Sequence, residues 1–382
     1  MKIRIVGAGP AGLYFAALAK AHAPSHDIVI YERNRRDATW GFGVVFSDRA
    51  LEFLRADDEA MYQYLIPHMQ SWSDLAVVHR GERVAIAGNG FASIGRLELL
   101  QLLYHHAESL GVTIQFETDI RSLDELPEAD LVLATDGAFS LLREQHEAQL
   151  GTRTEWHTNQ FIWYGTSRVF DTLTLTFRET PLGVFCAHHY RYSADMSTFL
   201  VEVDAATWQR AGFATMRPQD TMALCEQVFA EDLQGHPIIS NHSHWRRFPA
   251  ISNEHWSHGN LVLLGDALRT VHFSIGSGTR MAMEDAIALA KALRSTSDIA
   301  QALHLFEQSR APAMHKIMEA ARVSLHWYEQ MAEHMPLNPT DFAYAYMRRT
   351  GRVSHAAIKR MDPRLAAAWE AQHPDMPAPP AR

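Results

Sequence analysis

The N-terminal stretch KIRIVGAGPAGLYFAALAKA constrains the fold more than any other part of the chain. A short β-branched run over residues 2–6 stops at a glycine-rich turn, and from Pro10 the pattern becomes helical. In such a turn one glycine permits the tight bend, a second lets the backbone approach a pyrophosphate, and a third lets the helix pack closely on the strand. The helix N-terminus adds free amides and the positive end of its dipole. The residues of this turn are Gly7, Gly9, Ala11 and Gly12.

A carboxylate follows where a bound nucleotide needs one. The next strand, DIVIYE over residues 27–32, ends on Glu32, about 20 residues beyond Gly12, which closes a βαβ unit of the usual length. A carboxylate at this point can accept hydrogen bonds from ribose hydroxyls. Glycine turns are common, but strand, helix and acid occur together here, so a purely structural turn is the weaker interpretation.

Two later strands also end on turns that contain aspartate. Residues 129–135 (ADLVLAT) precede Asp136 and Gly137, and residues 260–266 (NLVLLGD) end on Asp266. The carboxyl ends of parallel strands meet at one edge of a sheet, where ligands of open α/β folds bind. We therefore expect both turns at the same crevice, although the first of them, taken alone, would also fit an ordinary loop.

A second glycine-rich segment, GDALRTVHFSIGSGTRMAMEDA, precedes a long helical pattern. Gly276 and Gly278 would bring bare backbone N–H groups against a planar ring, and the following helix would direct the positive end of its dipole at that ring. Phe273 and Ile275 would add a flat apolar wall.

Between the nucleotide-binding segments the pattern changes to short alternating strands: QFIWYGTS, LTLTFRET, GVFCAHHYRY and STFLVEVD. Their spacing predicts an antiparallel sheet inserted into a parallel α/β fold. Alternation along GVFCAHHYRY places His188 and Tyr190 on one face and His189 on the other. The predicted organisation is a nucleotide-binding domain in two parts, 1–154 and 251–332, a substrate domain over 155–250, and a C-terminal helical segment and tail over 333–382.

Composition excludes several classes of function. The chain has 382 residues and a net charge of −9, which gives no basic field for nucleic acid or an anionic membrane. No apolar run approaches the roughly 20 residues that span a bilayer. Cys186 and Cys225 are the only cysteines and are far apart, so we expect no disulfide framework and a cytoplasmic protein. The histidine pairs lack a third ligand at suitable spacing, and no metal site is predicted.

Taken in order, GAGPAG with the acid of YER, Arg96 in IGRLELL, the ATDG turn and GDA…GSG resemble the single-component FAD-dependent aromatic hydroxylases of the p-hydroxybenzoate hydroxylase type. Within that family the chain is most similar to salicylyl-CoA 5-hydroxylases and the flavin domain of anthraniloyl-CoA monooxygenase, through GFGVVFSD and HFSIGSGT. It is similar as well to the hydroxylase of protodeoxyviolaceinate, through FIWYGTS and LVLLGDAL. The resemblance implies a Rossmann-like α/β FAD-binding fold with an inserted antiparallel sheet and C-terminal helices.

The resemblance also implies FAD as the cofactor, NAD(P)H as the cosubstrate that reduces it, and O2 as the source of the oxygen atom placed on an aromatic ring. In RNRR, Arg33 is assigned to the adenosine end of FAD. The residues expected to contact FAD are Gly7, Gly9, Ala11, Gly12, Glu32, Arg33, Arg96, Asp136, Gly137, Asp266, Gly276 and Gly278.

We expect the substrate to be a benzoyl-CoA thioester with an ortho hydroxyl or amino group, hydroxylated para to that group. Free salicylate is an alternative that needs a buried cation, which Arg269 or Arg280 would supply if either points inward; both depart from the family pattern. An indolic secondary metabolite is a second alternative. A non-oxygenase FAD oxidoreductase and a binding module stay open as other classes. A flavin-dependent halogenase is disfavoured because the motif WxWxIP does not occur.

Two histidines, His188 and His272, are the candidates for a base that deprotonates the ring substituent, although a hydrogen-bonded core histidine is at least as good an interpretation of His188. The small-molecule substrate and O2 are the expected partners, with a homodimer as a further expectation. The residues expected to contact the substrate are Val45, Tyr164, Tyr190, Phe273 and Ile275.

Overall fold

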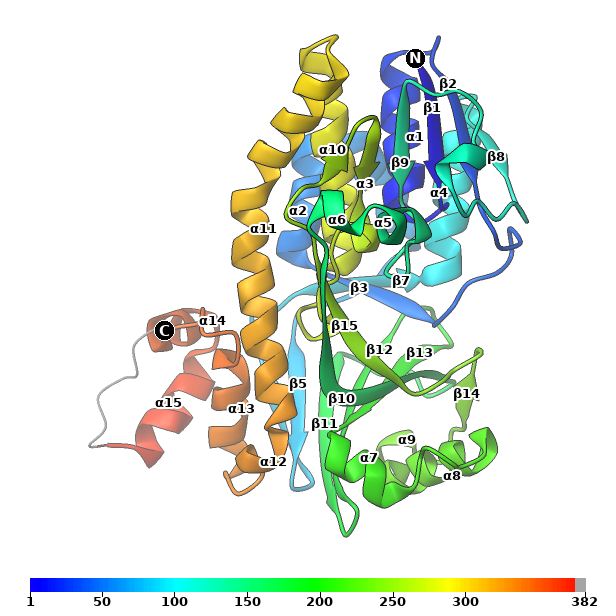
Figure 1. Cartoon of the computed structure of the whole chain (residues 1–382). Coiled ribbons are helices and arrows are strands. Elements are labelled where there is room, and N and C mark those ends of the chain that lie inside the picture. Colours follow the sequence, from blue (N-terminus) through cyan, green and yellow to red (C-terminus); the bar gives the residue numbers. More distant parts are fainter. Residues whose placement is uncertain (375–382) are drawn as a thin grey trace.

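The structure, a computed structural model, describes residues 1–374 and contains two large sheets alongside one long helix (Figure 1). The first sheet has six strands in the order β16–β17–β9–β1–β2–β8, and all but β16 run parallel. Its central strands are apolar because both faces are covered. The strands are β1 (Lys2–Val6), β2 (Asp27–Tyr31), β8 (Thr113–Gln115), β9 (Leu131–Ala134), β16 (Ser257–His258) and β17 (Leu261–Leu263).

Helix α1 packs against α4 and α10 beside this sheet. It can approach the sheet closely because Gly12 has no side chain: a Cβ there would lie 2.5 Å from Oγ1 of Thr135. The helices of this part are α1 (Pro10–His22), α2 (Asp48–Asp57), α3 (Glu59–Leu65), α4 (Arg96–Ser109), α5 (Leu141–Gln145), α6 (Glu147–Leu150) and α10 (Gly278–Ser295).

The second sheet has eight strands in the order β14–β10–β13–β12–β11–β5–β6, with β15 paired to β10. Its four central strands form the antiparallel arrangement that the sequence predicts. The strands are β5 (Leu75–His79), β6 (Glu82–Ile86), β10 (Arg153–Thr166), β11 (Leu173–Thr180), β12 (Gly183–Arg191), β13 (Ser197–Val203), β14 (Ile238–Ser240) and β15 (Arg246–Ser252).

The sheet draws on more of the chain than the predicted substrate domain, 155–250. Strands β5 and β6 come from the segment assigned to the first part of the nucleotide-binding domain, and β5 pairs parallel to β11. A third, small sheet from the same segment consists of β3 (Gly43–Ser47), β4 (Gln70–Trp72) and β7 (Phe91–Gly95). The chain therefore visits the second sheet before it reaches residue 155.

The two faces of the second sheet are covered differently. Helices α7 (Ala205–Ala211), α8 (Pro218–Val228) and α9 (Ala230–Leu233) bury one face in an aromatic core. On the other face, α11 (Ile299–Glu329), α12 (Met331–His334) and α13 (Pro339–Arg348) form a second core with β5, β11 and β12. Figure 1 shows α11 running along both sheets, with α14 (His355–Met361) and α15 (Pro363–Gln372) outside it.

The end of the predicted tail, residues 375–382, lies outside the described residues. Among the helices of residues 1–374, none is both long and apolar enough to cross a bilayer.

Candidate active site

A cleft runs along the carboxyl ends of β1, β2 and β9, where the sequence predicts nucleotide binding. Tyr104, Thr135 and Trp40 also line it. The predicted cofactor residues that line the cleft are Gly7, Gly9, Glu32, Arg33, Arg96, Asp136 and Gly137.

Each glycine of the first turn lies at its position for a different structural reason. Gly7 has a φ of 98°, and a Cβ on it would lie 2.5 Å from the carbonyl oxygen of Thr135. Only glycine fits there. Gly9 is the residue that precedes α1 and meets nothing closer than 3.7 Å at its Cβ position, so its backbone faces open space in the cleft. Gly12 lines neither the cleft nor the cavity described next; its place is in the contact between helix and strand.

The carboxylate of Glu32 is fixed before any ligand binds. Its Oε2 accepts a hydrogen bond from the N–H of Ala8 at 2.8 Å, and its Oε1 accepts from the backbone and side chain of Asn34 at 2.8 and 2.7 Å. Each oxygen still has acceptor capacity toward the cleft. Glu32 is therefore held in one orientation at the end of β2, where it lines the cleft.

Three buried polar atoms of residues that line the cleft have no hydrogen-bond partner within residues 1–374: Oδ1 of Asp136, Nε of Arg96 and Oγ1 of Thr39. Burial raises the pKa of Asp136 and lowers that of Arg96. Buried polar groups are rarely left unsatisfied in native proteins, so these atoms indicate a polar ligand in the cleft. A dinucleotide such as FAD fits this set of donors and acceptors.

The main cavity, with a volume of about 520 Å3, adjoins the cleft and shares Gly9, Arg96 and Gly137 with it. The N-terminus of α10 lies at its wall through Gly278 and Thr279, so the positive end of the helix dipole faces the cavity. Gly276 has a φ of 57°, and a Cβ on Gly278 would meet nothing within 4 Å. Bare backbone therefore faces the space where the sequence predicts a planar ring.

Asp266 lies at the junction of the cleft and the main cavity. Its side chain is open to the cavity, although protein surrounds it, and burial raises the pKa of its carboxyl while Arg96 and Arg269 oppose that rise. Its carboxylate accepts no hydrogen bond from residues 1–374. It is thus available to a hydroxyl-bearing ligand that passes from the cleft into the cavity.

The remaining walls of the main cavity are mostly apolar and aromatic. Four of the predicted substrate contacts, Val45, Tyr190, Phe273 and Ile275, line it. The hydroxyl of Tyr190 donates to the carbonyl oxygen of Gly43 at 2.9 Å, which leaves the ring to face the cavity. Residues that line the same cavity but that the sequence did not single out include Leu75, Phe161, Trp163, Leu175, Leu200 and Arg349.

The prediction for Tyr164 is not supported by its position. Tyr164 is 1% exposed and belongs to the core under α7, α8 and α9, on the other face of the sheet. Its neighbours Phe161 and Trp163 line the main cavity instead. Successive side chains of a strand alternate between faces, so the cavity receives the odd-numbered residues of this part of β10.

Of the two predicted bases, His188 lines the main cavity. Its Nε2 lies 3.2 Å from Oε2 of Glu202, and Oε1 of that carboxylate accepts a hydrogen bond from Nδ2 of Asn159 at 2.8 Å. The ring of His188 stacks on Tyr328, with 5.1 Å between ring centres. Neither Glu202 nor Asn159 was foreseen, because only the pairing of three strands brings them to His188.

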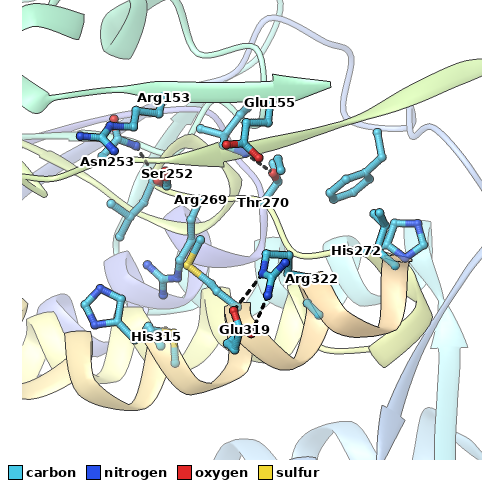
Figure 2. A pocket seen from close by; sticks show the side chains of 18 of the residues that line it. Arg153, Glu155, Ser252, Asn253, Arg269, Thr270, His272, His315, Glu319 and Arg322 are labelled. Carbon is cyan, nitrogen blue, oxygen red and sulfur yellow. Dashed lines mark hydrogen bonds and ion pairs between the residues drawn. The ribbon is translucent and has the colours of Figure 1, made fainter. Parts of the chain in front are cut away.

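The other predicted base, His272, lies at a different cavity of about 560 Å3. Figure 2 shows this second cavity between β10 and β15 on one side and α11 on the other, with His272 at one end. His272 packs edge-on against Phe248, which lines both cavities, and burial lowers its pKa to about 4. His272 does not line the main cavity, so its predicted role as a base there is not supported.

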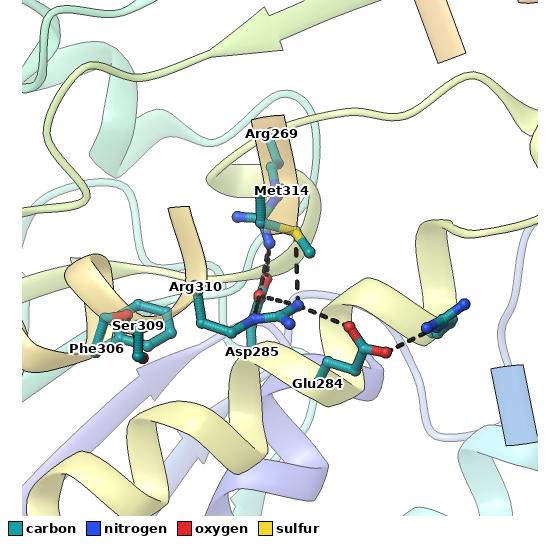
Figure 3. Close-up of polar contacts among 8 residues, drawn as sticks. Arg269, Glu284, Asp285, Phe306, Ser309, Arg310 and Met314 are labelled. Atoms are coloured by element: carbon teal, nitrogen blue, oxygen red, sulfur yellow. Dashed lines mark hydrogen bonds and ion pairs between the residues drawn. The ribbon is translucent and has the colours of Figure 1, made fainter. Parts of the chain in front are cut away.

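The two arginines considered as cations for the substrate, Arg269 and Arg280, are paired with carboxylates, and Figure 3 shows Arg269 directed at Asp285. Nη2 of Arg269 lies 2.6 Å from the buried carboxylate of Asp285, and Nε of Arg280 lies 2.7 Å from Glu284. Arg310 joins the two carboxylates at 2.9 and 3.1 Å. Neither Arg269 nor Arg280 lines the main cavity. Arg269 joins the segment after β17 to α10, the pair of Arg280 lies within α10, and Arg310 is the residue that ties α11 to α10.

Arg349, at the end of α13, is the cation that the substrate part of the main cavity does contain. Its Nη2 donates to the carbonyl oxygen of Ser274 at 2.8 Å, and its guanidinium lies 4.0 Å from the centre of the Tyr346 ring. Its Nε is buried without a hydrogen-bond partner in residues 1–374. Within residues 1–374 there is no cluster of three or more histidine, cysteine or acidic side chains that could hold a metal ion.

Comparison with known proteins agrees with this geometry. A family model described as an FAD binding domain matches residues 125–321, and one described as an NAD(P)-binding Rossmann-like domain matches residues 5–51. Among solved structures, that of 2-methyl-3-hydroxypyridine-5-carboxylic acid oxygenase has a TM-score of 0.71 at 16% identity, with 94% of this chain and 98% of that one covered. It establishes the shared fold.

Three curated relatives are similar along most of the chain. A salicyloyl-CoA 5-hydroxylase of a Streptomyces species is 41% identical over 92% of this chain and 70% of its own length. A 3-hydroxy-4-methyl-anthranilyl-[aryl-carrier protein] 5-monooxygenase of Streptosporangium sibiricum is 35% identical, with 87% and 90% covered. The protodeoxyviolaceinate monooxygenase of Chromobacterium violaceum is 35% identical, with 91% and 94% covered.

Proposed function

The chain belongs to the FAD-dependent aromatic hydroxylases, which use NAD(P)H as cosubstrate, and we propose that its own substrate is a benzoyl thioester with an ortho hydroxyl or amino group, hydroxylated para to that group. The observation that carries the proposal is the main cavity: a chamber with aromatic walls directly beside the residues expected to hold FAD, which contains Arg349 in addition to the Arg96 that it shares with the cleft.

FAD, when bound, supplies the redox chemistry: it takes two electrons from NAD(P)H and passes one oxygen atom of O2 to the ring. The cleft residues Glu32, Asp136 and Arg96 would hold its nucleotide and ribityl parts, and Asp266 would accept a hydroxyl at the junction. The positive end of α10 would stabilise negative charge on the reduced ring.

The chain's own contribution to the reaction is to orient the substrate and to exclude water. Phe161, Trp163 and Phe273 form apolar walls that an aromatic plane can fill. Holding the ring in one orientation selects the carbon that receives oxygen, and a dry chamber prevents loss of the activated oxygen to solvent. Because His188 lines this chamber and His272 does not, His188 is the base we propose for the ring substituent.

Arg349 is the proposed contact for the carbonyl oxygen of the thioester. Its position beside Phe273 and Ser274 supports donation of a hydrogen bond to an acyl oxygen at one end of the ring. The names of two relatives, a salicyloyl-CoA hydroxylase and a hydroxylase of an aryl-carrier protein substrate, support a thioester over a free acid.

Two other substrates have specific support. Arg349 could also pair with the carboxylate of free salicylate, since a guanidinium binds carboxylates well. An indolic substrate is supported by the protodeoxyviolaceinate relative. No relative named here supports an oxidoreductase without oxygen chemistry.

The test compares salicylyl-CoA, anthraniloyl-CoA, free salicylate and an indolic acid. Substrate-stimulated oxidation of NAD(P)H and the hydroxylated product, identified by mass spectrometry, are measured for each with the wild-type protein and with Arg349→Met. We expect product from a thioester, and a KM for it that rises about 10–100-fold in the variant, the loss of one charge-assisted hydrogen bond. Turnover of the free acid or the indole alone would refute the thioester proposal.

We also propose that the protein works in the cytoplasm as a homodimer. Cys186 and Cys225 are both buried thiols, which suits a reducing compartment. Trp156 on β10 is 48% exposed, and a second copy could cover it. Light scattering coupled to size-exclusion chromatography gives the mass of the assembly.

A further inference from the structure

Glu202 is a buried carboxylate beside the main cavity that no sequence motif singled out. It lies on β13, is 0% exposed, and shares its face of the strand with Thr198 and Leu200, which line the cavity. Burying a carboxylate is costly unless hydrogen bonds replace the lost hydration. Its presence in the middle of a sheet therefore requires partners.

Each carboxylate oxygen of Glu202 has a hydrogen-bond partner. Asn159 Nδ2 donates to Oε1 at 2.8 Å, and His188 Nε2 is 3.2 Å from Oε2. The partners come from the strands on either side, because β13 pairs with β10 and with β12. Burial would raise the pKa of Glu202, but the hydrogen bond from His188, the electrostatic attraction of His272 and His188 and the hydrogen bond from Asn159 together outweigh burial and hold the pKa below its usual range. The carboxylate is therefore ionised at neutral pH.

This contact sets the tautomer of His188. A ring nitrogen that faces a carboxylate carries the hydrogen, so Nε2 is the donor and Nδ1 keeps its lone pair. Nδ1 has no hydrogen-bond partner within residues 1–374, and the side chain lines the main cavity. Nδ1 is thus the atom that can accept a proton from a molecule in the cavity, and Glu202 would stabilise the imidazolium that forms.

The other groups around His188 do not take over this role. These groups are Cys186 on β12, His272 in the 268–276 segment, Tyr328 on α11, Tyr346 on α13 and Arg349 directly after α13. Burial raises the pKa of the Cys186 thiol and of the two tyrosine phenols, and it lowers the pKa of His272 to about 4, so all four are neutral at pH 7. Arg349 is a cation and cannot accept a proton.

We propose that Glu202 is a positioning residue that holds His188 as the base for a hydroxyl group on the substrate ring. The inference rests on the proposed function and deepens it. The O–H bond of the substrate breaks, an Nδ1–H bond forms, and the electron pair stays on the oxygen and enriches the ring. After oxygen transfer the ring carbon loses its hydrogen as a proton, which joins the second oxygen atom of O2 as that atom leaves as water, and the proton on His188 returns to the ring oxygen before product leaves.

The same pair has nothing to remove from a ring amine. A neutral arylamine already donates electrons to the ring, and its N–H is far too weak an acid for an imidazole to deprotonate. The buried pair of Glu202 and His188 therefore favours the hydroxyl-activated substrate over the amino-activated one.

The experiment uses the FAD-loaded full chain with salicylyl-CoA and anthraniloyl-CoA as probes. In the wild type we expect the absorption band of the phenolate when salicylyl-CoA binds at pH 7. In Glu202→Gln the pH at which that band appears should rise by at least about one unit, and kcat for salicylyl-CoA should fall about 10–100-fold while KM changes little, as expected for an impaired general base. The kcat for anthraniloyl-CoA should change less than about threefold, in keeping with a base that has no part in that reaction.

Matched variants separate this role from a structural one. Glu202→Asp should restore part of the rate, and Glu179→Gln, which removes an exposed carboxylate from β11, should change nothing. Bound FAD and the melting temperature are measured for each variant. Equal losses of rate with both thioesters in Glu202→Gln, with an unmoved phenolate band, would overturn the inference and leave the proposed function intact.

Failure of the proposed function looks different. If the wild-type protein turns over neither thioester, the substrate proposal falls, and the phenolate titration is then made with free salicylate. A shift of that band in Glu202→Gln would uphold the role of Glu202, and an unchanged band would refute it.

Discussion

Asp266 is the single residue on which cofactor affinity should depend most visibly. Its carboxylate faces the junction of the cleft and the main cavity and accepts no hydrogen bond from residues 1–374. Its replacement therefore removes no hydrogen bond from the folded apoprotein. We expect Asp266→Ala to weaken FAD binding about 10–100-fold, the effect of one hydrogen bond to a charged group. Titration of the apoprotein with FAD, followed by flavin fluorescence, measures it.

The control for this prediction is Asp171→Ala, which removes an exposed carboxylate from the loop between β10 and β11. It should leave FAD affinity unchanged. A normal affinity in Asp266→Ala would remove Asp266 from the cofactor site, and a loss of the folded state in that variant would show that its carboxylate supports the fold instead.

At this scale the sequence predicts residues whose role depends on their neighbours in the chain. Gly7 and Glu32 are recognisable because turn, strand and helix follow one another directly. Glu202 and Asn159 are not, because their meeting with His188 depends on the register of three strands. The one available signal is a charged residue at an inward position of the apolar strand STFLVEV, which marks a buried carboxylate but not its partner.

At the scale of the element, the alternation of β10 leads to a sharp contrast between neighbours. Trp163 lines the main cavity, and Tyr164 lies in the opposite core. We expect Trp163→Ala to raise KM for the aromatic substrate roughly 10-fold, from lost ring contacts. Tyr164→Ala should instead lower the free energy of unfolding by about 3–5 kcal/mol through a core cavity and leave KM unchanged.

Steady-state kinetics and urea unfolding of the two variants check the contrast, with Tyr164→Phe as the variant that keeps the packing. If Tyr164→Phe alters KM, the assignment of faces along β10 is wrong. The period of two in the sequence fixes that residues 162 and 164 share a face. It does not fix which face meets the cavity, since both faces of β10 are largely apolar.

The elements that the sequence missed share one cause. Strands β5 and β6 lie about 70 residues before the other strands of their sheet, at 75–86, and nothing local indicates that β5 will pair with β11. Strands of the parallel sheet were predictable because they are followed by turns that contain glycine or an acidic residue, which are recognisable in the sequence. Pairings between distant segments are decided by tertiary packing, which a local pattern does not encode.

For the whole molecule, the flavin side and the C-terminal helices form one unit. Oγ of Ser274 hydrogen-bonds to Oγ of Ser324 on α11 at 2.9 Å, and Arg349 at the end of α13 donates to the backbone of Ser274. The segment that carries Gly276 and Gly278, the glycines expected to face the flavin, is therefore held from two helices that follow it in the chain. This is why a motif-based division at residue 332 separates parts that work together.

Acid stability is a property of the whole molecule that follows from two buried histidines. Burial lowers the pKa of His189 to about 3 and that of His272 to about 4, from 6.5 in an unfolded chain. His189 hydrogen-bonds to Oγ1 of Thr176 at 2.9 Å and stacks on Phe199. Both rings are neutral in the folded state and take up a proton on unfolding at acid pH, so the unfolded state binds more protons below pH 6.5.

The stability that these neutral histidines allow is complete above pH 6.5 and is lost as pH falls toward 4. Each contributes a slope of up to about 1.4 kcal/mol per pH unit in the free energy of unfolding. His189→Gln keeps a hydrogen-bonding group for Thr176 but cannot titrate, so it should reduce the slope between pH 6 and 4.5 by about that amount. Urea unfolding at a series of pH values measures the slope, which does not depend on any constant loss of stability in the variant. Equal slopes in the two proteins would mean that His189 is already protonated in the folded state.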